Sequence, residues 1–467
     1  MRYEKTFPFN LVQYGAKIIL YGAGKLGRQY WEQVIACQWG TIICVVDKNY
    51  QNIDDFPTEV YNPEYISKIT EFDYIVIAAI LQHNREEIYY ELLEKGITET
   101  KIVSSVDQYF MYDKMRVLPY EPAGIDENKL SIAFCPMGTL GDYIISLKFY
   151  QELVKYVKNA VVDIYAITIS FAKCIFQQQS YLGTIYGGSW DWNKYYDLVI
   201  EVGVRIHIVF LNRRRLQALA SELSVKIECL QKRNRIEFSQ YPAHSYYTSR
   251  LMVDRGKFLG ENRYTAYNCE GIFNITDKKV ELYLKDDAER EFVKLGLEKN
   301  YITFNYGADR YSKGEKPKNK MWPKEYHSKL NQLLKDTYPE IEIVQIGADN
   351  IEKISGADRY IMGEDLEIVK VILKNALCHI DCEGGLVHMA TQLGTKCAVL
   401  FGPTPSWFFG YDENINIVSP KCKECVYLFP DWQINCHKYD RPECMYSITP
   451  EIVLEKVSDH LESIKEQ

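Results

Sequence analysis

Three times along the chain, a short apolar run leads directly into a turn that contains glycine and then into a helical pattern. The runs cover residues 17–21, 130–134 and 376–380. Apolar strands that alternate with helices form parallel sheets with helices packed on their faces. The chain is therefore predicted to be an α/β protein in which such units follow one another.

The length of the chain and the spacing of these units predict three domains. A chain of 467 residues is long enough for about three domains at roughly 150 residues each. We predict an N-terminal α/β domain over 1–115, a polar, proline-bearing linker over 116–128, a second domain over 129–298 and a third over 299–467.

Composition and charge narrow the classes of function. Hydrophobic residues make up 47% and charged residues 25%, which are ordinary globular values and exclude extended disorder. A formal charge of -8 argues against nucleic acid as a partner. No apolar run reaches the roughly 18 residues of a membrane span, and the start lacks the apolar core of a signal peptide. We therefore expect a cytoplasmic protein.

Two basic clusters leave a peripheral contact with the inner face of a membrane open. They cover 213–215 and 232–235, in the second predicted domain. Such clusters can meet an anionic glycolipid or membrane surface. A solvated surface with no such partner is the alternative.

The first glycine turn has the form Gly-x-Gly-x-x-Gly. It contains Gly22, Gly24 and Gly27, and Asp47 ends the next apolar run. Glycines allow close approach of a pyrophosphate, the helix N-terminus attracts phosphate, and an acid can hold ribose hydroxyls. We predict that these four residues bind a nucleotide or dinucleotide; a vestigial, empty site is the alternative.

This N-terminal region resembles the nucleotide-binding Rossmann domains that are attached to bacterial polysaccharide-biosynthesis proteins. Short-chain dehydrogenases use a Tyr-x-x-x-Lys pair on a helix. Within residues 1–115 that spacing occurs only across the glycine turn itself. We therefore expect an accessory domain rather than an oxidoreductase.

Four further motifs occur in order between residues 130 and 455. They are Met137-Gly-Thr-Leu-Gly141-Asp142, Tyr306-Gly-Ala-Asp with the later Lys320-Met-Trp322-Pro323, Asp381-Cys-Glu383-Gly384-Gly385-Leu-Val-His388, and Val399-Leu-Phe401-Gly402-Pro403-Thr404. Together they resemble glycosyltransferase family 9, the ADP-heptose:lipopolysaccharide heptosyltransferases and their relatives. The resemblance implies a GT-B type pair of Rossmann-like domains, with the acceptor mostly on the first and the nucleotide sugar on the second. Here a third, N-terminal Rossmann-like domain precedes the pair.

The resemblance also implies roles for particular residues. Inverting glycosyl transfer needs a base for the acceptor hydroxyl and positive groups for the departing diphosphate. Asp142 is the candidate base, Lys320 the cation at the diphosphate, and His388 a further catalytic group. The candidate substrate-binding residues are Gly141, Glu383, Gly384, Gly385 and Thr404.

Each of these assignments has a structural alternative: a helix N-cap for the acid, a solvated lysine and a half-buried histidine. The family usually has Asp, then Ser or Thr, then Gly, where this chain has Glu383, Gly384 and Gly385. The longer acid puts ADP-heptose in doubt as the donor, while a nucleotide sugar is still expected. The sequence contains no Asp-x-Asp, which fits a metal-independent GT-B enzyme.

Four of the thirteen cysteines cluster near the C-terminus, at Cys422, Cys425, Cys436 and Cys444. Four thiolates at such spacing can hold a tetrahedral zinc or iron ion. Some relatives in the family hold an iron in this region, and disulfides are disfavoured in the cytoplasm. We predict a structural zinc or iron; reduced thiols without a metal are the alternative.

The motifs together predict an inverting glycosyltransferase of lipopolysaccharide or polysaccharide biosynthesis. It would move heptose or a related sugar from a nucleotide-sugar donor to a glycan, glycolipid or protein acceptor. One alternative is an NAD-dependent sugar-modifying enzyme, favoured only by the motif at Gly22. Another is a protein of the same fold that binds a nucleotide or glycan without turnover, suggested by Glu383. The oligomeric state is left open.

Overall fold

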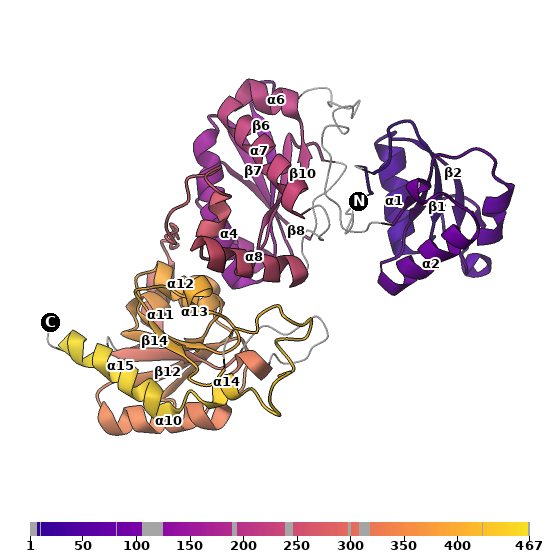
Figure 1. The fold of residues 1–467 in the computed structure, drawn as a ribbon. Coiled ribbons are helices and arrows are strands. Elements are labelled where there is room, and N and C mark those ends of the chain that lie inside the picture. Colours follow the sequence, from indigo (N-terminus) through magenta and orange to yellow (C-terminus); the bar gives the residue numbers. More distant parts are fainter. Residues whose placement is uncertain are drawn as a thin grey trace.

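The structure is a computed structural model with three α/β units, which Figure 1 colours from indigo to yellow along the chain. It describes residues 7–9, 11–80, 82–104, 125–188, 194–238, 246–297, 300–307, 318–422 and 424–465. Most of the predicted linker 116–128 lies outside these residues, as do residues 298–299 at the next predicted boundary. The domain boundaries therefore stay predictions.

The first unit is a five-stranded parallel sheet with the strand order β3-β2-β1-β4-β5. Its strands are β1 (Lys17–Tyr21), β2 (Thr41–Val46), β3 (Val60–Tyr61), β4 (Tyr74–Ile77) and β5 (Ile102–Val103), and its helices are α1 (Lys25–Ala36) and α2 (Gln82–Glu94). Four of the five residues of β1 are buried, because a central parallel strand is covered on both faces.

The second unit is a five-stranded sheet with the order β10-β9-β6-β7-β8. Its strands are β6 (Leu130–Pro136), β7 (Ala160–Ala166), β8 (Leu182–Gly187), β9 (Leu198–Val202) and β10 (Ile206–Leu211), and its helices are α4 (Leu140–Leu153), α5 (Ile169–Phe176), α6 (Arg213–Leu219), α7 (Ser221–Phe238) and α8 (Tyr246–Leu259). Strand β10 runs antiparallel to β9. Its three-residue connection, 203–205, is too short for the crossover that a parallel pair needs.

The third unit is a six-stranded parallel sheet with the order β13-β12-β11-β14-β15-β16. Its strands are β11 (Tyr301–Asn305), β12 (Glu342–Gly347), β13 (Arg359–Met362), β14 (Cys378–Cys382), β15 (Cys397–Phe401) and β16 (Ile415–Val418). Its helices are α9 (Ala288–Lys294), α10 (Lys324–Thr337), α11 (Leu366–Asn375), α12 (Gly385–Gln392), α13 (Ser406–Phe409), α14 (Glu443–Tyr446) and α15 (Pro450–Lys465). The strand order reverses between β11 and β14, where ligands bind in open α/β sheets.

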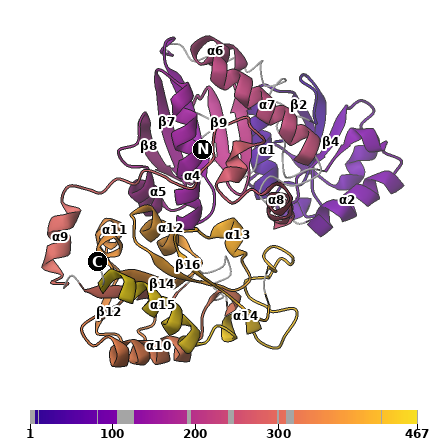
Figure 2. The ribbon, with the colours of Figure 1, turned by 60° about the vertical axis from the view of Figure 1, so that its left-hand side comes forward.

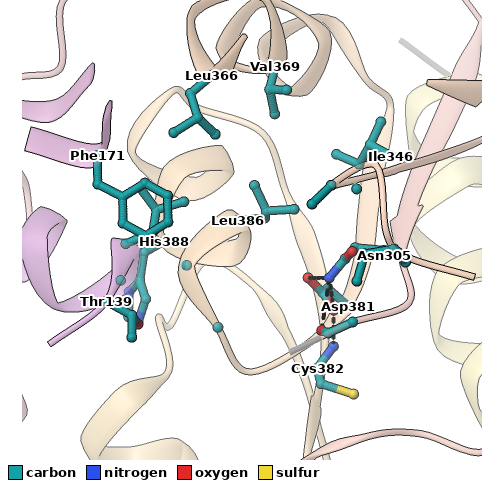
Figure 3. Close-up of a pocket in the computed structure, with 18 of the residues that line it drawn as sticks. Thr139, Phe171, Asn305, Ile346, Leu366, Val369, Asp381, Cys382, Leu386 and His388 are labelled. Atoms are coloured by element: carbon teal, nitrogen blue, oxygen red, sulfur yellow. Dashed lines mark hydrogen bonds between the residues drawn. The ribbon is translucent and has the colours of Figure 1, made fainter. Parts of the chain in front are cut away.

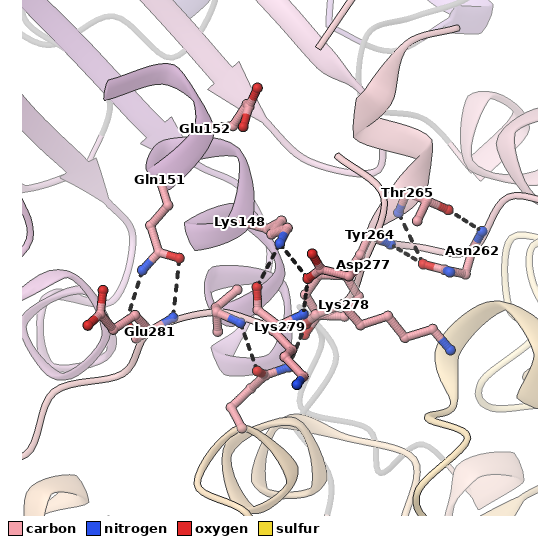
Figure 4. A network of polar contacts seen from close by, with 12 residues as sticks. Lys148, Gln151, Glu152, Asn262, Tyr264, Thr265, Asp277, Lys278, Lys279 and Glu281 are labelled. Carbon is pink, nitrogen blue, oxygen red and sulfur yellow. Dashed lines mark hydrogen bonds and ion pairs between the residues drawn. The ribbon is translucent and has the colours of Figure 1, made fainter. Parts of the chain in front are cut away.

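The second and third units face each other, and the predicted fold class is confirmed. Figures 1 and 2 both place α4 and α8 of the second unit next to α12 and α13 of the third. Residues 277–281, in the segment that connects the two units, are held by polar contacts with α4, which Figure 4 shows. The Lys148 ammonium lies 2.7 Å from the Asp277 carboxylate, and the Gln151 amide donates to the carbonyl of Glu281. No described helix combines the length and the apolar character that a membrane-spanning helix needs.

Candidate functional site

A cavity of about 850 Å³ lies between the second and third units. It is bounded by the N-terminal ends of α4 and α12 and by loops that follow β11, β12 and β13. These are carboxyl ends of parallel strands, and β11 is next to the reversal of strand order in the third sheet. The cavity therefore lies where this architecture binds ligands.

The structure brings the residues of the four motifs together around this cavity. Its lining includes all eight predicted catalytic and substrate-binding residues: Gly141, Asp142, Lys320, Glu383, Gly384, Gly385, His388 and Thr404. The glycine motif of the first unit and the four-cysteine cluster do not line it. One cavity thus receives an acid from the second unit and a lysine, a glutamate and a histidine from the third.

Two helix N-termini meet at one edge of the cavity because each helix has a glycine in its first turn. A Cβ on Gly141 of α4 would lie 3.0 Å from the His388 ring, and a Cβ on Gly385 of α12 would lie 2.9 Å from Leu140. Residues with side chains would therefore push the helices apart. Helix N-termini carry partial positive charge and unpaired N–H groups. This edge is suited to an anion such as a diphosphate.

Asp142 lies in the first turn of α4 and is half-buried. The backbone N–H of Thr139 donates to its Oδ2 at 3.1 Å, so the carboxylate does cap the helix. Its Oδ1 lies 3.6 Å from Nη2 of the buried Arg263. The side chain keeps 35% of its surface exposed, and the residue lines the cavity, so capping leaves it within reach of a ligand.

Lys320, Glu383 and His388 form a charged group on the third unit. Nζ of Lys320 lies 2.9 Å from Oε2 of Glu383, and Nε2 of His388 lies 3.7 Å from Oε1. Burial alone would raise the pKa of Glu383, but Lys320 and His388 outweigh it and lower that pKa to about 2. Burial works against the charge of Lys320, yet Glu383 raises the pKa of this ammonium. The lysine is therefore charged, and its charge is paired with Glu383.

His388 has a further partner on its other ring nitrogen. Its Nδ1 lies 2.6 Å from the hydroxyl of Tyr411, which in turn lies 2.5 Å from the hydroxyl of Tyr264. His388 and both tyrosines are buried. The histidine is thus satisfied inside the protein, as its structural alternative requires, while still lining the cavity.

The rest of the cavity is lined by apolar side chains and by a hydrogen-bonded pair of polar side chains. Figure 3 shows the apolar side chains, which come from both units: Phe171, Ile346, Leu366, Val369 and Leu386. In the polar pair, the Asn305 amide donates to Oδ2 of Asp381 at 3.2 Å; the two residues lie on β11 and β14, where the strand order reverses. Burial raises the pKa of Asp381. An apolar wall with a few convergent polar groups is typical of small-molecule sites.

Some residues of the site could not be found from the motifs. Asn305 ends an apolar strand, a position that parallel sheets use for ligands, and this signal could have identified it. Arg263 and Tyr411 lie far along the chain from Asp142 and His388, and no local pattern distinguishes them. Only the packing of the two units brings them to the site.

The glycine turn of the first unit has the geometry of a phosphate loop. Gly22 has a φ of 118°, and a Cβ on Gly27 would collide with the carbonyl of Gly22. A Cβ on Gly24 would meet no atom within 4 Å, so open space faces that position. Asp47 accepts hydrogen bonds from the backbone N–H groups of Ala23 and Asn49, so its carboxylate also fixes the loop. Nucleotide binding here stays a prediction.

The four cysteines lie near one another in the segment after β16. Burial first, and then the neighbouring thiols of Cys422 and Cys436, raise the pKa of Cys425 to about 11. Burial first, and then the neighbouring thiols of Cys425 and Cys422, raise the pKa of Cys444 to about 12. Among the residues that the structure describes, no three His, Cys, Asp or Glu side chains are arranged to hold a metal ion. The zinc or iron therefore stays a prediction.

Three arginines of the two predicted basic clusters pair with acids of the same unit. Arg215 pairs with Asp197 at 2.7 Å, and Arg213 lies 3.3 Å from Glu228. Arg233 of the second cluster lies 3.7 Å from a carboxylate oxygen of Glu270. These contacts favour a structural role for the arginines over a free basic surface.

A family model and a curated relative both match parts of this chain. Residues 14–103 match the family model described as C2185-like, N-terminal. The chain is 24% identical over 239 residues to lipopolysaccharide heptosyltransferase 1 of Campylobacter coli, in a match that covers 46% of this chain and 65% of that protein. The resemblance to glycosyltransferase family 9 is confirmed. The matched region spans just under two thirds of that relative's length.

Solved structures of glycosyltransferases are similar at low identity. A family 9 glycosyltransferase of Veillonella parvula is 13% identical with a TM-score of 0.44, covering 73% of this chain and all of that one. Heptosyltransferase II of E. coli is 16% identical with a TM-score of 0.42, covering 72% and 100%. The iron-containing dodecameric glycosyltransferase TibC of enterotoxigenic E. coli is 14% identical with a TM-score of 0.45, covering 72% and 80%.

Proposed function

We propose that the chain is a glycosyltransferase that moves heptose or a related sugar from a nucleotide sugar to a glycan hydroxyl. The observation that carries this proposal is one cavity in which Asp142 of the second unit meets Lys320, Glu383 and His388 of the third. The similarity to a lipopolysaccharide heptosyltransferase supports the same reaction.

In the proposed reaction, the Asp142 carboxylate removes the proton of the acceptor hydroxyl as its oxygen attacks the anomeric carbon of the donor. The bond between that carbon and the diphosphate oxygen breaks on the opposite face, so the configuration inverts. The bonding electrons leave with the diphosphate. Lys320 and the N–H groups at the starts of α4 and α12 stabilise the charge that develops there.

Glu383 imposes a condition on donor binding. Its carboxylate already pairs with Lys320, so a diphosphate must share this lysine or displace the glutamate. An ionised carboxylate repels phosphate oxygens but accepts hydrogen bonds from hydroxyls. We therefore assign Glu383 to hydroxyls of the transferred sugar, and Lys320 to the diphosphate.

The donor is tested with two nucleotide sugars that differ in both base and sugar. Purified protein is mixed with ADP-heptose or UDP-N-acetylglucosamine, and with lipopolysaccharide that lacks heptose as the acceptor. We expect ADP to be released from ADP-heptose only when the acceptor is present, and the anomeric configuration of the product, read by NMR, to be inverted. Release from neither donor would contradict the proposed reaction.

A second candidate function is binding of a nucleotide sugar without turnover. The observation that favours it is the ion pair between Lys320 and Glu383, because it offsets the positive charge that would stabilise a leaving diphosphate. Calorimetry would then detect ADP-heptose binding, while no ADP would be released with any acceptor. The same two assays therefore separate the two candidates.

We further propose that residues 1–115 form an accessory domain with a nucleotide at Gly22, Gly24, Gly27 and Asp47. Support comes from the space in front of Gly24 and from the fixed loop. We also propose that the four cysteines hold a structural zinc or iron, which the closeness of their thiols supports. The reaction uses neither group.

A further inference from the structure

Arg263 is a buried cation next to the candidate base. It follows α8, and only 1% of its surface is exposed. Its Nη2 donates to the carbonyl of Gly203 at 2.8 Å, and the guanidinium lies over the ring of Tyr267. Its Nη1 is buried and makes no hydrogen bond within the described part of the chain. Burying a charge is costly unless a counter-charge is close.

The counter-charge of Arg263 is the Asp142 carboxylate. Nη2 lies 3.6 Å from Oδ1, while Oδ2 accepts the N–H of Thr139. One carboxylate oxygen therefore accepts a hydrogen bond, and the other faces the guanidinium at an ion-pair distance. A general base must present its lone pair to the acceptor hydroxyl in one orientation, and small displacements of such groups lower turnover strongly.

The next residue of the same segment reaches the other side of the site. The hydroxyl of Tyr264 contacts that of Tyr411, which contacts His388. The backbone N–H of Arg263 donates to the carbonyl of Phe408 in the third unit at 2.9 Å. The pair Arg263–Tyr264 thus joins the acid of the second unit to the histidine of the third.

We propose that Arg263 is a positioning residue that orients the Asp142 carboxylate for proton removal. This inference rests on the proposed function, because it takes Asp142 to be the base. Arg263 does not line the cavity, so it acts on the substrates only through Asp142.

The first test compares three variants in the ADP-release assay with ADP-heptose and lipopolysaccharide that lacks heptose. Arg263→Met should lower kcat by roughly 10- to 100-fold and change the KM for ADP-heptose by less than about twofold. Arg263→Lys should recover part of kcat, because it keeps the cation. The matched control is Arg215→Met, which removes another buried arginine–aspartate pair, beyond the amino end of β6. This control should lower the melting temperature and leave kcat unchanged.

The second test asks whether Arg263 acts through Asp142. Each Arg263 variant is combined with Asp142→Asn, and the fold-loss in kcat is compared in the two backgrounds. We expect less than about twofold additional loss from Arg263→Met when Asp142 is already replaced. An equal loss in both backgrounds would overturn the inference. If Arg263→Met does not fold, Arg263→Lys carries the same comparison.

The outcomes also separate this inference from the proposed function. Near-wild-type turnover of Asp142→Asn alone would contradict the proposed function. Loss of turnover in Asp142→Asn together with an additive effect of Arg263 would contradict only the positioning role.

Discussion

At the scale of single residues, Glu383 departs most clearly from the family motif. Its carboxylate reaches Lys320 at 2.9 Å and His388 at 3.7 Å. With a pKa of about 2, it is ionised at any pH at which the protein would be assayed. The cavity therefore contains a permanent negative charge beside the cation proposed for the diphosphate.

Replacing Glu383 tests this charge balance. Glu383→Gln keeps the size of the side chain and removes the charge, so Lys320 becomes free for phosphate. We expect calorimetry to show ADP binding roughly tenfold tighter, about 1.4 kcal/mol, than in the wild type. Turnover of ADP-heptose should fall, because the contact with the sugar is weakened. Unchanged or weaker binding of ADP would contradict the assignment of Lys320 to the diphosphate.

At the scale of elements, much of the fold could be predicted from the sequence. Buried strands are continuous apolar runs, and the glycine turns after β1 and β6 mark the start of a helix. The antiparallel β10 was not expected, because its direction depends on a three-residue connection. The pairing of Lys320 with Glu383 was not expected either, since it depends on how the third unit packs.

The glycine turn of the first unit gives a prediction with a matched control. Gly24→Val should leave the fold intact, because a Cβ there meets no atom within 4 Å. It should abolish binding of ADP or NAD in a thermal-shift assay, since the valine would fill the space of the phosphates. Gly27→Val is the control for folding: its Cβ would collide with the Gly22 carbonyl and destabilise the unit. Unchanged binding by Gly24→Val would show that this loop holds no nucleotide.

The segment that contains the four cysteines, residues 422–444, contacts the residue next to Lys320 of the cavity, which is Asn319. Its backbone N–H donates to the carbonyl of Gln433 and its side-chain amide to that of Trp432, and Lys320 follows directly in the chain. Order in the cysteine segment is therefore expected to affect the position of Lys320.

A metal at the cysteines is tested by its amount and by its effect on stability. Elemental analysis of purified protein should find about one zinc or iron per chain, and Cys425→Ser should lower both that amount and the melting temperature. Cys229→Ser, at an exposed cysteine of α7, is the control and should change neither. A stable protein without metal would end this prediction.

The third unit contains a buried histidine that predicts how stability depends on pH. His327 packs against Phe304 and Trp322, and burial lowers its pKa to about 3 from an unfolded value of 6.5. Below pH 6.5 the unfolded chain therefore binds a proton that the folded chain does not. Stability should fall by up to about 1.4 kcal/mol per pH unit as the pH drops from 6.5 towards 3. His327→Gln should reduce this dependence in chemical denaturation; an unchanged slope would show that His327 is not its source.

At the scale of the whole molecule, the second and third units are connected by more than the chain. Lys370 of α11 is fully buried, and its ammonium donates to the carbonyls of Cys174 at 2.6 Å and Tyr283 at 2.8 Å. At the other end of the interface, α4 and α12 meet through glycines. These contacts define the cavity from both sides, so the acid of one unit is held close to the charged group of the other.

The central claim is that this cavity catalyses glycosyl transfer with Asp142 as the base. The most direct measurement is the turnover of Asp142→Asn against wild type, with saturating ADP-heptose and heptose-free lipopolysaccharide. The substitution keeps the shape of the side chain, so calorimetry should find the affinity for ADP-heptose unchanged. Turnover should fall by roughly 10²- to 10⁴-fold, the usual contribution of a general base. Near-wild-type turnover would contradict the claim and leave Asp142 as a helix cap.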